Sequence, residues 1–194
     1  HNHVSKPNEK IGLYGGSFDP IHNGHLILAR DAMELLDLER VIFLPARISP
    51  FKLDRPPAPP EARCQMLSAA IAEEPRFEMD PCEVEREGPS FTIDTLRALQ
   101  SRRPDAKFYY FIGDDNLAEL HGWKDISALR QAVQFVVLSR AGTPFVSEFP
   151  TITRHIEISS TEIRSRVARG LSVRYMAPLP VCEVIANLGL YRND

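Results

Sequence analysis

The chain has 194 residues, of which 43% are hydrophobic and 25% charged, a composition typical of a folded globular protein with its own core. The formal net charge of -3 argues against a broad nucleic-acid face, although it allows a local basic pocket for a small anion. No apolar run approaches the roughly 20 residues that span a bilayer, so we expect no membrane segment.

The three cysteines, Cys64, Cys82 and Cys182, lie far apart and form no C-x-x-C pair, so the sequence indicates neither a zinc site nor a disulfide framework. Reduced thiols are typical of the cytoplasm, which is the location we expect. Residues 1–9 are polar and lack the apolar segment of a signal peptide. We therefore expect a flexible tail before a single domain over residues 10–194.

Strand and helix patterns alternate from the start of this domain. Residues 10–15 are a short apolar run ending in glycine, residues 24–38 carry apolar residues at helical spacing, and residues 40–46 are a second apolar run. This order implies a right-handed crossover and parallel pairing of the two strands. Residues 47–60 contain five prolines, so we expect an exposed, irregular loop there.

The alternation continues along the rest of the chain. We expect strands or extended segments at residues 77–86, 107–113 and 134–140 and from residue 155, and helices at residues 61–74, 90–103, 114–133 and 159–170 and near the C-terminus, with Ser90 as a helix cap. The pattern predicts a doubly wound α/β domain with a mostly parallel sheet and helices on both faces. Ligands of such sheets bind at the carboxyl ends of the strands.

A glycine- and histidine-rich motif, GLYGGSFDPIHNGH, occupies residues 12–25 and follows the first strand. Gly15 and Gly16 carry no side chain that would hinder close backbone approach, and Ser17 offers a hydroxyl. These residue types suit a loop that holds phosphate. A glycine pair between a strand and a helix also commonly serves only the turn, so this part of the motif leaves both interpretations open.

Two histidines close the motif at the predicted start of the first helix. The free N–H groups of a helix beginning near Asn23 or Gly24 favour an anion, and His22 and His25 lie at that positive end. Imidazole N–H groups donate to phosphate oxygens, so the motif predicts a phosphate cradle. A structural histidine pair is the simpler alternative.

Other ligand-binding signatures are missing from the sequence. A zinc site needs a third ligand, and neither His121 nor His155 lies in a convincing partner motif. There is no G-x-x-x-x-G-K-S/T phosphate loop and no G-x-G-x-x-G dinucleotide fingerprint.

A second motif, ISSTEIRSRVARG, lies in the last third of the chain. Ser159 and Glu162 fit a capping box, so one interpretation is a well-capped helix and nothing more. The functional alternative is a polyphosphate site made by the helix N-terminus, two hydroxyls and a guanidinium, from Ser160, Thr161 and Arg164.

Both motifs resemble those of the nucleotidyltransferase superfamily. Residues 15–25 resemble its signature G-G-S/T-F-D-P-x-H-x-G-H, and residues 158–164 resemble its I-S-S-T-x-I-R motif. Segments 88–96, 111–129 and 170–191 are similar to those of bacterial nicotinate-nucleotide adenylyltransferases, so that the resemblance covers nearly all of the chain.

The resemblance implies transfer of the adenylyl group of ATP to nicotinate mononucleotide, giving deamido-NAD and pyrophosphate in NAD biosynthesis. It implies Mg²⁺ accompanying ATP, with no protein metal ligand that we can name, and no nucleic-acid or membrane partner. It further implies His22 and His25 as catalytic and ATP-binding, ATP contacts at Gly15, Gly16, Ser17, Phe18, Gly113, Asp115, Ser159, Ser160 and Arg164, and mononucleotide contacts at Lys52, Thr92, Trp123 and Lys124.

Two of these assignments have simple structural alternatives. Trp123, expected to stack on the pyridine ring, is also compatible with an ordinary core residue. Asp115, expected near the ATP or ribose hydroxyls, is also compatible with capping of the next helix. We expect the nicotinate carboxylate to meet free backbone N–H groups at Thr92 and at a helix start near Trp123 and Lys124.

The sequence departs from the family pattern at two positions. Phe51 stands where a histidine is expected before Lys52, and Phe91 replaces the usual tyrosine. Rival functions are adenylyl transfer to nicotinamide mononucleotide or to a phosphopantetheine, and a non-catalytic nucleotide-binding protein. The phosphopantetheine enzymes usually carry threonine at the position of His22. The sequence makes no prediction of the oligomeric state.

Overall fold

The computed structural model describes residues 7–47, 55–141 and 147–193. The strands are β1 (Lys10–Gly16), β2 (Arg40–Pro45), β3 (Phe77–Met79), β4 (Lys107–Gly113), β5 (Val133–Ser139) and β6 (Thr151–Thr153). The helices are α1 (Asn23–Leu35), α2 (Pro60–Ile71), α3 (Cys82–Glu85), α4 (Thr92–Arg102), α5 (Ile126–Ala132), α6 (Ser160–Ala168) and α7 (Leu179–Leu188), with a 3₁₀ helix, η2 (Asp114–Gly122), after β4.

The strands of these described segments form one sheet, in the order β3-β2-β1-β4-β5-β6. Every neighbouring pair of strands is parallel. The chain therefore builds the sheet outward from β1 in one direction and then returns to build outward from β4 in the other. This arrangement confirms the predicted doubly wound parallel sheet, and it places a crevice between β1 and β4 at their carboxyl ends.

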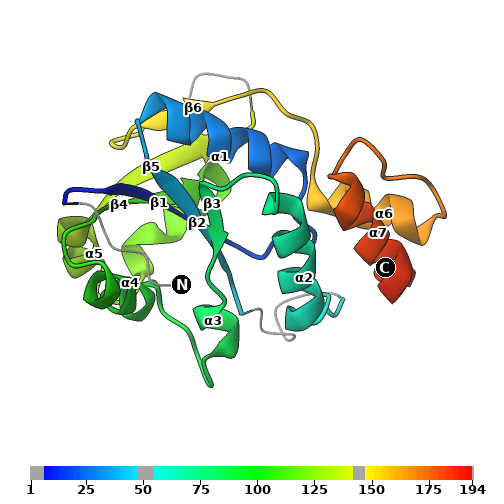
Figure 1. Ribbon diagram of the computed structural model, residues 1–194, viewed down its shortest axis with the longest axis horizontal. Helices are drawn as coiled ribbons and strands as arrows, with labels where there is room; N and C mark the ends of the chain where they lie inside the picture. The colour runs from blue at the N-terminus through cyan, green and yellow to red at the C-terminus, as the bar shows by residue number, and fades with distance from the viewer. Residues whose placement is uncertain (1–6, 48–54, 142–146, 194) are drawn as a thin grey trace.

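Each face of the sheet has its own apolar core. Helices lie on both sides of the sheet (Figure 1). Successive side chains of a strand point to opposite faces, so in β2 Val41 and Phe43 join one core while Ile42 and Leu44 join the other. The first core includes residues of α1, α2 and α7, and the second includes residues of α4 and α5. Burial on both faces explains why the strands are apolar runs without a polar face.

Two segments differ from the sequence prediction near the edge strand β3. Residues 77–86 were expected to be extended, but the strand ends at Met79 and α3 follows. Pro81 caps α3, and the Asp80 carboxylate accepts a hydrogen bond from the Cys82 N–H at 3.0 Å, which favours a helical turn here. The cap of α4 is Phe91 rather than Ser90, whose hydroxyl instead accepts a hydrogen bond from Arg86.

The strand expected from residue 155 was also misplaced, because β6 lies earlier, at Thr151–Thr153. The backbone N–H groups of Arg154 and Ile156 still donate to Ser139 and Arg140. Because β5 ends at Ser139, the regular strand pairing stops there. Residues 154–159 then run to α6 without regular secondary structure.

The predicted N-terminal tail and the predicted proline-rich loop are each described only in part. Glu9, which we assigned to the tail, is buried and pairs with Arg40 at 2.6 Å, so packing extends at least one residue before β1. Phe51 and Lys52 fall outside the described residues. Among the residues that are described, no helix has the length and apolar character needed to cross a membrane.

Candidate active site

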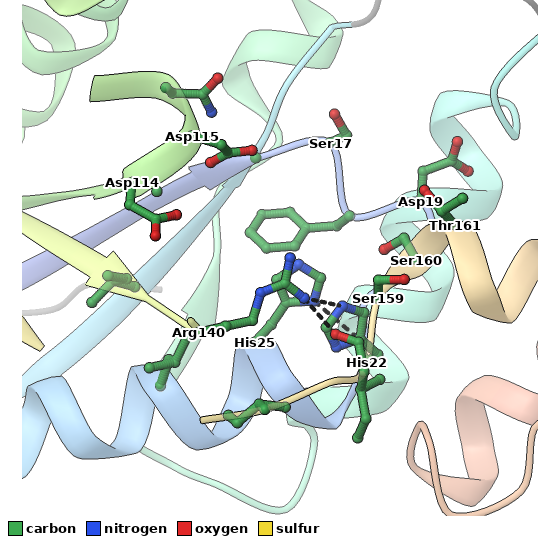
Figure 2. A pocket seen from close by; sticks show the side chains of 18 of the residues that line it. Ser17, Asp19, His22, His25, Asp114, Asp115, Arg140, Ser159, Ser160 and Thr161 are labelled. Carbon is green, nitrogen blue, oxygen red and sulfur yellow. Dashed lines mark hydrogen bonds between the residues drawn. The ribbon is translucent and has the colours of Figure 1, made fainter. Parts of the chain in front are cut away.

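A pocket of about 840 Å³ opens at the carboxyl ends of β1, β4 and β5 (Figure 2). It is bordered by the start of α1, the start of η2 and the start of α6. All residues expected to contact ATP line this pocket, namely Gly15, Gly16, Ser17, Phe18, His22, His25, Gly113, Asp115, Ser159, Ser160 and Arg164. The fold therefore gathers segments from both ends of the chain at the place where such sheets bind ligands.

The two histidines are held by the backbone of α1. His22 caps the helix, and its Nδ1 accepts a hydrogen bond from the Gly24 N–H at 3.0 Å. His25 lies one turn on, and its Nδ1 accepts from the His22 N–H at 3.1 Å. A Cβ on Gly24 would come within 2.8 Å of the His22 ring, so glycine is what lets that ring fold back over the helix start.

The histidine rings lie close together in a site that disfavours their charged forms. His22 is buried, and its ring centroid is 3.8 Å from that of His25. Burial, helped by the nearby Arg140 guanidinium, lowers the pKa of His22 to about 3. Burial, His22 and Arg140 together hold the pKa of His25 well below its ordinary value. Both rings are therefore neutral near pH 7.

Arg140 is a pocket residue that our sequence analysis missed. It directly follows β5, and its side chain reaches toward the histidine pair (Figure 2). Its Nη1 atom lies 3.5 Å from Nε2 of His22 and donates to the Ile158 carbonyl oxygen. The sequence did contain a signal that could have identified it, namely a basic residue directly after a buried strand. Parallel sheets bind ligands at the carboxyl ends of their strands.

The motif at the start of α6 joins the opening motif directly. Ser159 caps α6, since its hydroxyl accepts from the Glu162 N–H at 3.1 Å. The Ser160 hydroxyl donates to the Pro20 carbonyl oxygen at 2.8 Å, across 140 residues of sequence. Arg164 donates to the Asp19 carbonyl oxygen at 2.9 Å and also lines the pocket.

The Asp19 carboxylate ties the opening turn to two distant segments. This carboxylate is buried and accepts hydrogen bonds from Arg55 at 2.9 Å, from the Ala58 N–H at 3.2 Å and from the Tyr191 hydroxyl at 2.6 Å. A buried carboxylate with three donors is well satisfied, so the turn is firmly placed. Sequence alone gave no sign that Tyr191, near the C-terminus, packs here.

Arg63 also holds the opening turn in place through hydrogen bonds to backbone carbonyl oxygens. Its side chain is only 1% exposed, although it carries a guanidinium. It donates to the carbonyl oxygens of Ser17, Ala46 and Ala58 at 2.9, 2.8 and 3.1 Å. Three separate segments thus share one buried donor, which positions the phosphate-binding turn without itself lining the pocket.

A second, smaller pocket of about 290 Å³ adjoins the first. The two share Gly15, Gly16, Ser17, Gly113 and Asn116, and the smaller one also holds Thr92 and Trp123 among its lining residues. The Trp123 ring packs edge-on against Tyr110, with centroids 5.8 Å apart. Thr92 and Trp123, both expected to contact the mononucleotide, thus line the same pocket.

Two expectations about the smaller pocket need correction. The Trp123 N–H is not a free donor, because it donates to the Leu120 carbonyl oxygen at 3.1 Å, and the next helix begins only at Ile126. Lys124 is exposed, is not among the residues that line the pocket, and places its Nζ 4.5 Å from the centre of the Phe91 ring.

Glu83 is an unexpected feature of the smaller pocket. It lines the cavity from α3 and is 8% exposed. Burial raises the pKa of Glu83 to about 7, against the opposing charge of Arg86. The sequence gave no reason to expect a carboxyl at this place, because α3 was predicted to be extended.

The described residues contain no group of three or more histidine, cysteine, aspartate or glutamate side chains arranged to hold a metal ion. Asp114 and Asp115 do line the larger pocket at the start of η2. Asp115 is the second residue of η2, and its side chain lies among those that line the pocket (Figure 2).

Comparison with known proteins agrees with this geometry. A family model described as Cytidylyltransferase-like matches residues 13–166. A protein of Geobacillus thermodenitrificans named probable nicotinate-nucleotide adenylyltransferase is 42% identical over 185 residues, covering 94% of this chain and 86% of the relative. A protein of Opitutus terrae with the same name is 42% identical over 191 residues, covering 94% and 98%.

Solved structures share the fold. The Plasmodium falciparum nicotinic acid mononucleotide adenylyltransferase complexed with NaAD has a TM-score of 0.76 to this chain at 19% identity, covering 96% of this chain and 99% of that one. The same enzyme complexed with APC has a TM-score of 0.72 at 20% identity. At these identities the likeness concerns the fold alone.

Proposed function

The chain belongs to the cytidylyltransferase-like family and, within it, to the nicotinate-nucleotide adenylyltransferases, and we propose that its two adjoining pockets carry out their reaction. The chain transfers the adenylyl group of ATP to nicotinate mononucleotide and releases deamido-NAD and pyrophosphate, a step of NAD biosynthesis. What remains to be assigned is which residues do this, and where each substrate lies.

The single observation that supports the assignment is the way the two pockets meet. They share the backbone of Gly15, Gly16 and Ser17, the residues that end β1 and begin the phosphate-binding turn. Two nucleotides that join through their phosphates need separate pockets for their bases and one common place for the phosphates. We assign ATP to the larger pocket and nicotinate mononucleotide to the smaller one, with Trp123 beside the pyridine ring.

The reaction in this arrangement is a direct displacement. A 5′-phosphate oxygen of the mononucleotide forms a bond to the α-phosphorus of ATP, and the bond from that phosphorus to the oxygen bridging to the β-phosphate breaks. The electron pair leaves with pyrophosphate. The chain contributes positioning and charge stabilisation, with His22 and His25 donating to phosphate oxygens and with Ser160 and Arg164 holding the turn that carries the triphosphate.

Mg²⁺ is assigned to this reaction as part of the nucleotide substrate. ATP phosphates supply the hard oxygen ligands that Mg²⁺ prefers, and the ion commonly keeps few protein ligands in such sites. Asp114 and Asp115 are the carboxylates of the larger pocket that such an ion would meet through water. We also propose that the enzyme works in the cytoplasm, where its three cysteines would stay reduced.

The test is a competition assay. Purified protein is given ATP, Mg²⁺ and equal amounts of nicotinate and nicotinamide mononucleotides, and products are identified by mass while pyrophosphate is measured separately. Deamido-NAD as the main product is the expected result. NAD as the main product would move the enzyme to the amide-using class, and ATP binding without pyrophosphate release would indicate a nucleotide-binding protein instead.

A further inference from the structure

The hydrogen bonds at the start of α1 determine where the histidines carry their protons. Nδ1 of His22 accepts from the Gly24 N–H, and Nδ1 of His25 accepts from the His22 N–H. A backbone N–H can only donate, so neither Nδ1 atom holds a proton. A neutral imidazole carries one proton, which in both rings must then be on Nε2.

The surroundings oppose a second proton on either ring. The ring centroids are 3.8 Å apart with the ring planes tilted by 32°, so that two imidazolium charges would repel each other strongly in a buried site. A guanidinium faces them from the end of β5, and the aromatic rings of Tyr14 and Phe18 pack against His25. Burial and Arg140 lower the pKa of both histidines accordingly.

Other charged groups border the same pocket but come from other elements. Carboxylates are supplied by the opening turn, by η2 and by the segment before α6, and guanidinium groups by the loop before α2 and by α6; these are Asp19, Asp114, Asp115, Glu157, Arg55 and Arg164. Asp19 is bonded to Arg55, and Asp114 accepts from Ser139 at 2.8 Å. The charged group that acts on both histidines is Arg140.

Nε2 of His22 and Nη1 of Arg140 are 3.5 Å apart. With the proton of His22 on Nε2, both groups are donors, and their side chains meet in the larger pocket (Figure 2). An anionic oxygen is the partner that accepts from two such donors together, and charge-assisted hydrogen bonds of this kind are the stronger ones.

We infer that Arg140 is the permanent cation at the transferred phosphate and that His22 and His25 act beside it as neutral Nε2–H donors. The inference rests on the proposed adenylyl transfer. It assigns the positive charge of the reaction to a guanidinium and not to an imidazolium. The histidines then contribute fixed dipoles, and they neither titrate during turnover nor exchange a proton with the substrates.

The protonation of the histidines is tested without any substrate. Nitrogen-15 NMR of the labelled, ligand-free enzyme distinguishes a protonated ring nitrogen from an unprotonated one. We expect both histidines to show an unprotonated Nδ1 and a protonated Nε2, unchanged from pH 5.5 to pH 8. A proton on Nδ1, or titration of either ring near the ordinary value of about 6.5, would overturn the neutral-donor assignment.

The role of Arg140 is tested by kinetics, because its bond to the Ile158 carbonyl oxygen gives it a structural alternative. Arg140→Gln keeps a donor of similar reach without the charge, Arg140→Lys keeps the charge, and Arg169→Gln on the exposed end of α6 is the matched control. We expect Arg140→Gln to lower kcat by about 10² with a smaller change in the KM values, and Arg140→Lys to recover part of that loss.

The kinetics of these variants decide between a catalytic and a structural role of Arg140. Equal losses in Arg140→Gln and Arg140→Lys, or an effect of Arg140→Gln no larger than that of Arg169→Gln, would overturn the assignment of Arg140 as the phosphate cation. A wild-type enzyme that released no pyrophosphate would overturn the proposed function and this role with it. The NMR result would still decide the histidine protonation by itself.

Discussion

The two pockets at the end of the sheet are built by different means. The larger one is bordered by arginines, carboxylates and two histidines. Its turn is held by hydrogen bonds that Arg63 and Ser160 donate and by one that the Asp19 carboxylate accepts from Tyr191. The smaller one has aromatic walls and one buried carboxyl, Glu83. The carboxyl end of one sheet can thus serve recognition by charge and recognition by shape in two pockets that share Gly15, Gly16, Ser17, Gly113 and Asn116.

Glycine is required at this boundary. A Cβ on Gly15 would come within 2.4 Å of the Tyr110 hydroxyl, which belongs to the wall of the smaller pocket. The position that a Gly15 side chain would take thus faces the wall of the smaller pocket. The turn that follows β1 borders the larger pocket. Substitutions in the larger pocket and substitutions in the smaller pocket should therefore affect different kinetic constants.

The largest effect is expected on the charged side. His25→Ala should lower kcat by about 10² or more, because it removes a preorganised donor to developing charge while leaving the fold intact. Steady-state kinetics with circular dichroism as a check on folding would measure this, and His121→Ala, an exposed histidine of η2, is the control. Near-normal turnover of His25→Ala would remove this residue from the mechanism.

A smaller effect is expected from the arginine of α6. Arg164→Ala should raise the KM for ATP by about tenfold and that for the mononucleotide less, because hydrogen bonds to charged groups are worth about 1.5–3 kcal/mol. The comparison is made by varying each substrate at saturation with the other. If both KM values rise equally, the structural bond to the Asp19 carbonyl oxygen accounts for the residue, and the two pockets are not separable in this way.

On the apolar side we expect a preference for the acid over the amide of at least about tenfold in kcat/KM. Thr92 is the first residue of α4, so free N–H groups at that helix start favour a carboxylate, and an amide would leave one donor unpaired at about 1–3 kcal/mol. Trp123→Ala should weaken binding of both mononucleotides by similar factors and leave the ratio standing. A changed ratio would show that the indole itself discriminates between them.

The smallest effect on activity is expected at the buried carboxyl, whose contribution is to stability. Glu83 has its pKa raised from 4.5 to about 7, so the folded chain holds this proton where the unfolded chain has lost it. The stability that it contributes is present below pH 4.5 and is lost as the pH rises through 7. Glu83→Gln, which mimics the protonated form, should therefore be more stable than wild type at pH 8, by about 3 kcal/mol.

Urea denaturation at several pH values would measure this difference. The gain of Glu83→Gln should shrink as the pH falls and vanish near pH 4.5. The matched control is Glu85→Gln, an exposed residue of the same helix. A gain that stays constant with pH would mean that Glu83 does not change its protonation on folding.

The features that sequence predicted well are local. The apolar runs, the helix start at His22 and the cap at Ser159 depend on residues a few positions apart, and the structure has them where expected. The parallel order of the strands followed from their alternation with helices. The roles of the predicted ATP and mononucleotide residues stay predictions, although all of the predicted ATP residues line one pocket.

The features that sequence did not predict depend on contacts between distant segments. Tyr191 reaches Asp19 across 172 residues, and Arg140 reaches His22 across 118. The hydrophobic periodicity of the sequence does not reveal such contacts, because they form only when the sheet has brought the segments together. The same reason explains the error at Trp123, whose N–H is taken by a turn of η2 that apolar spacing does not specify.

The central claim is that the two substrates react directly with each other where the pockets meet, with no covalent bond to the chain. It is tested most directly by the configuration at the α-phosphorus, using ATP that carries a sulfur at one α-position of known handedness. A single in-line displacement predicts deamido-NAD with inverted configuration. Retention would indicate two displacements through an adenylyl-enzyme, with one of the histidines as the nucleophile, and would contradict the account.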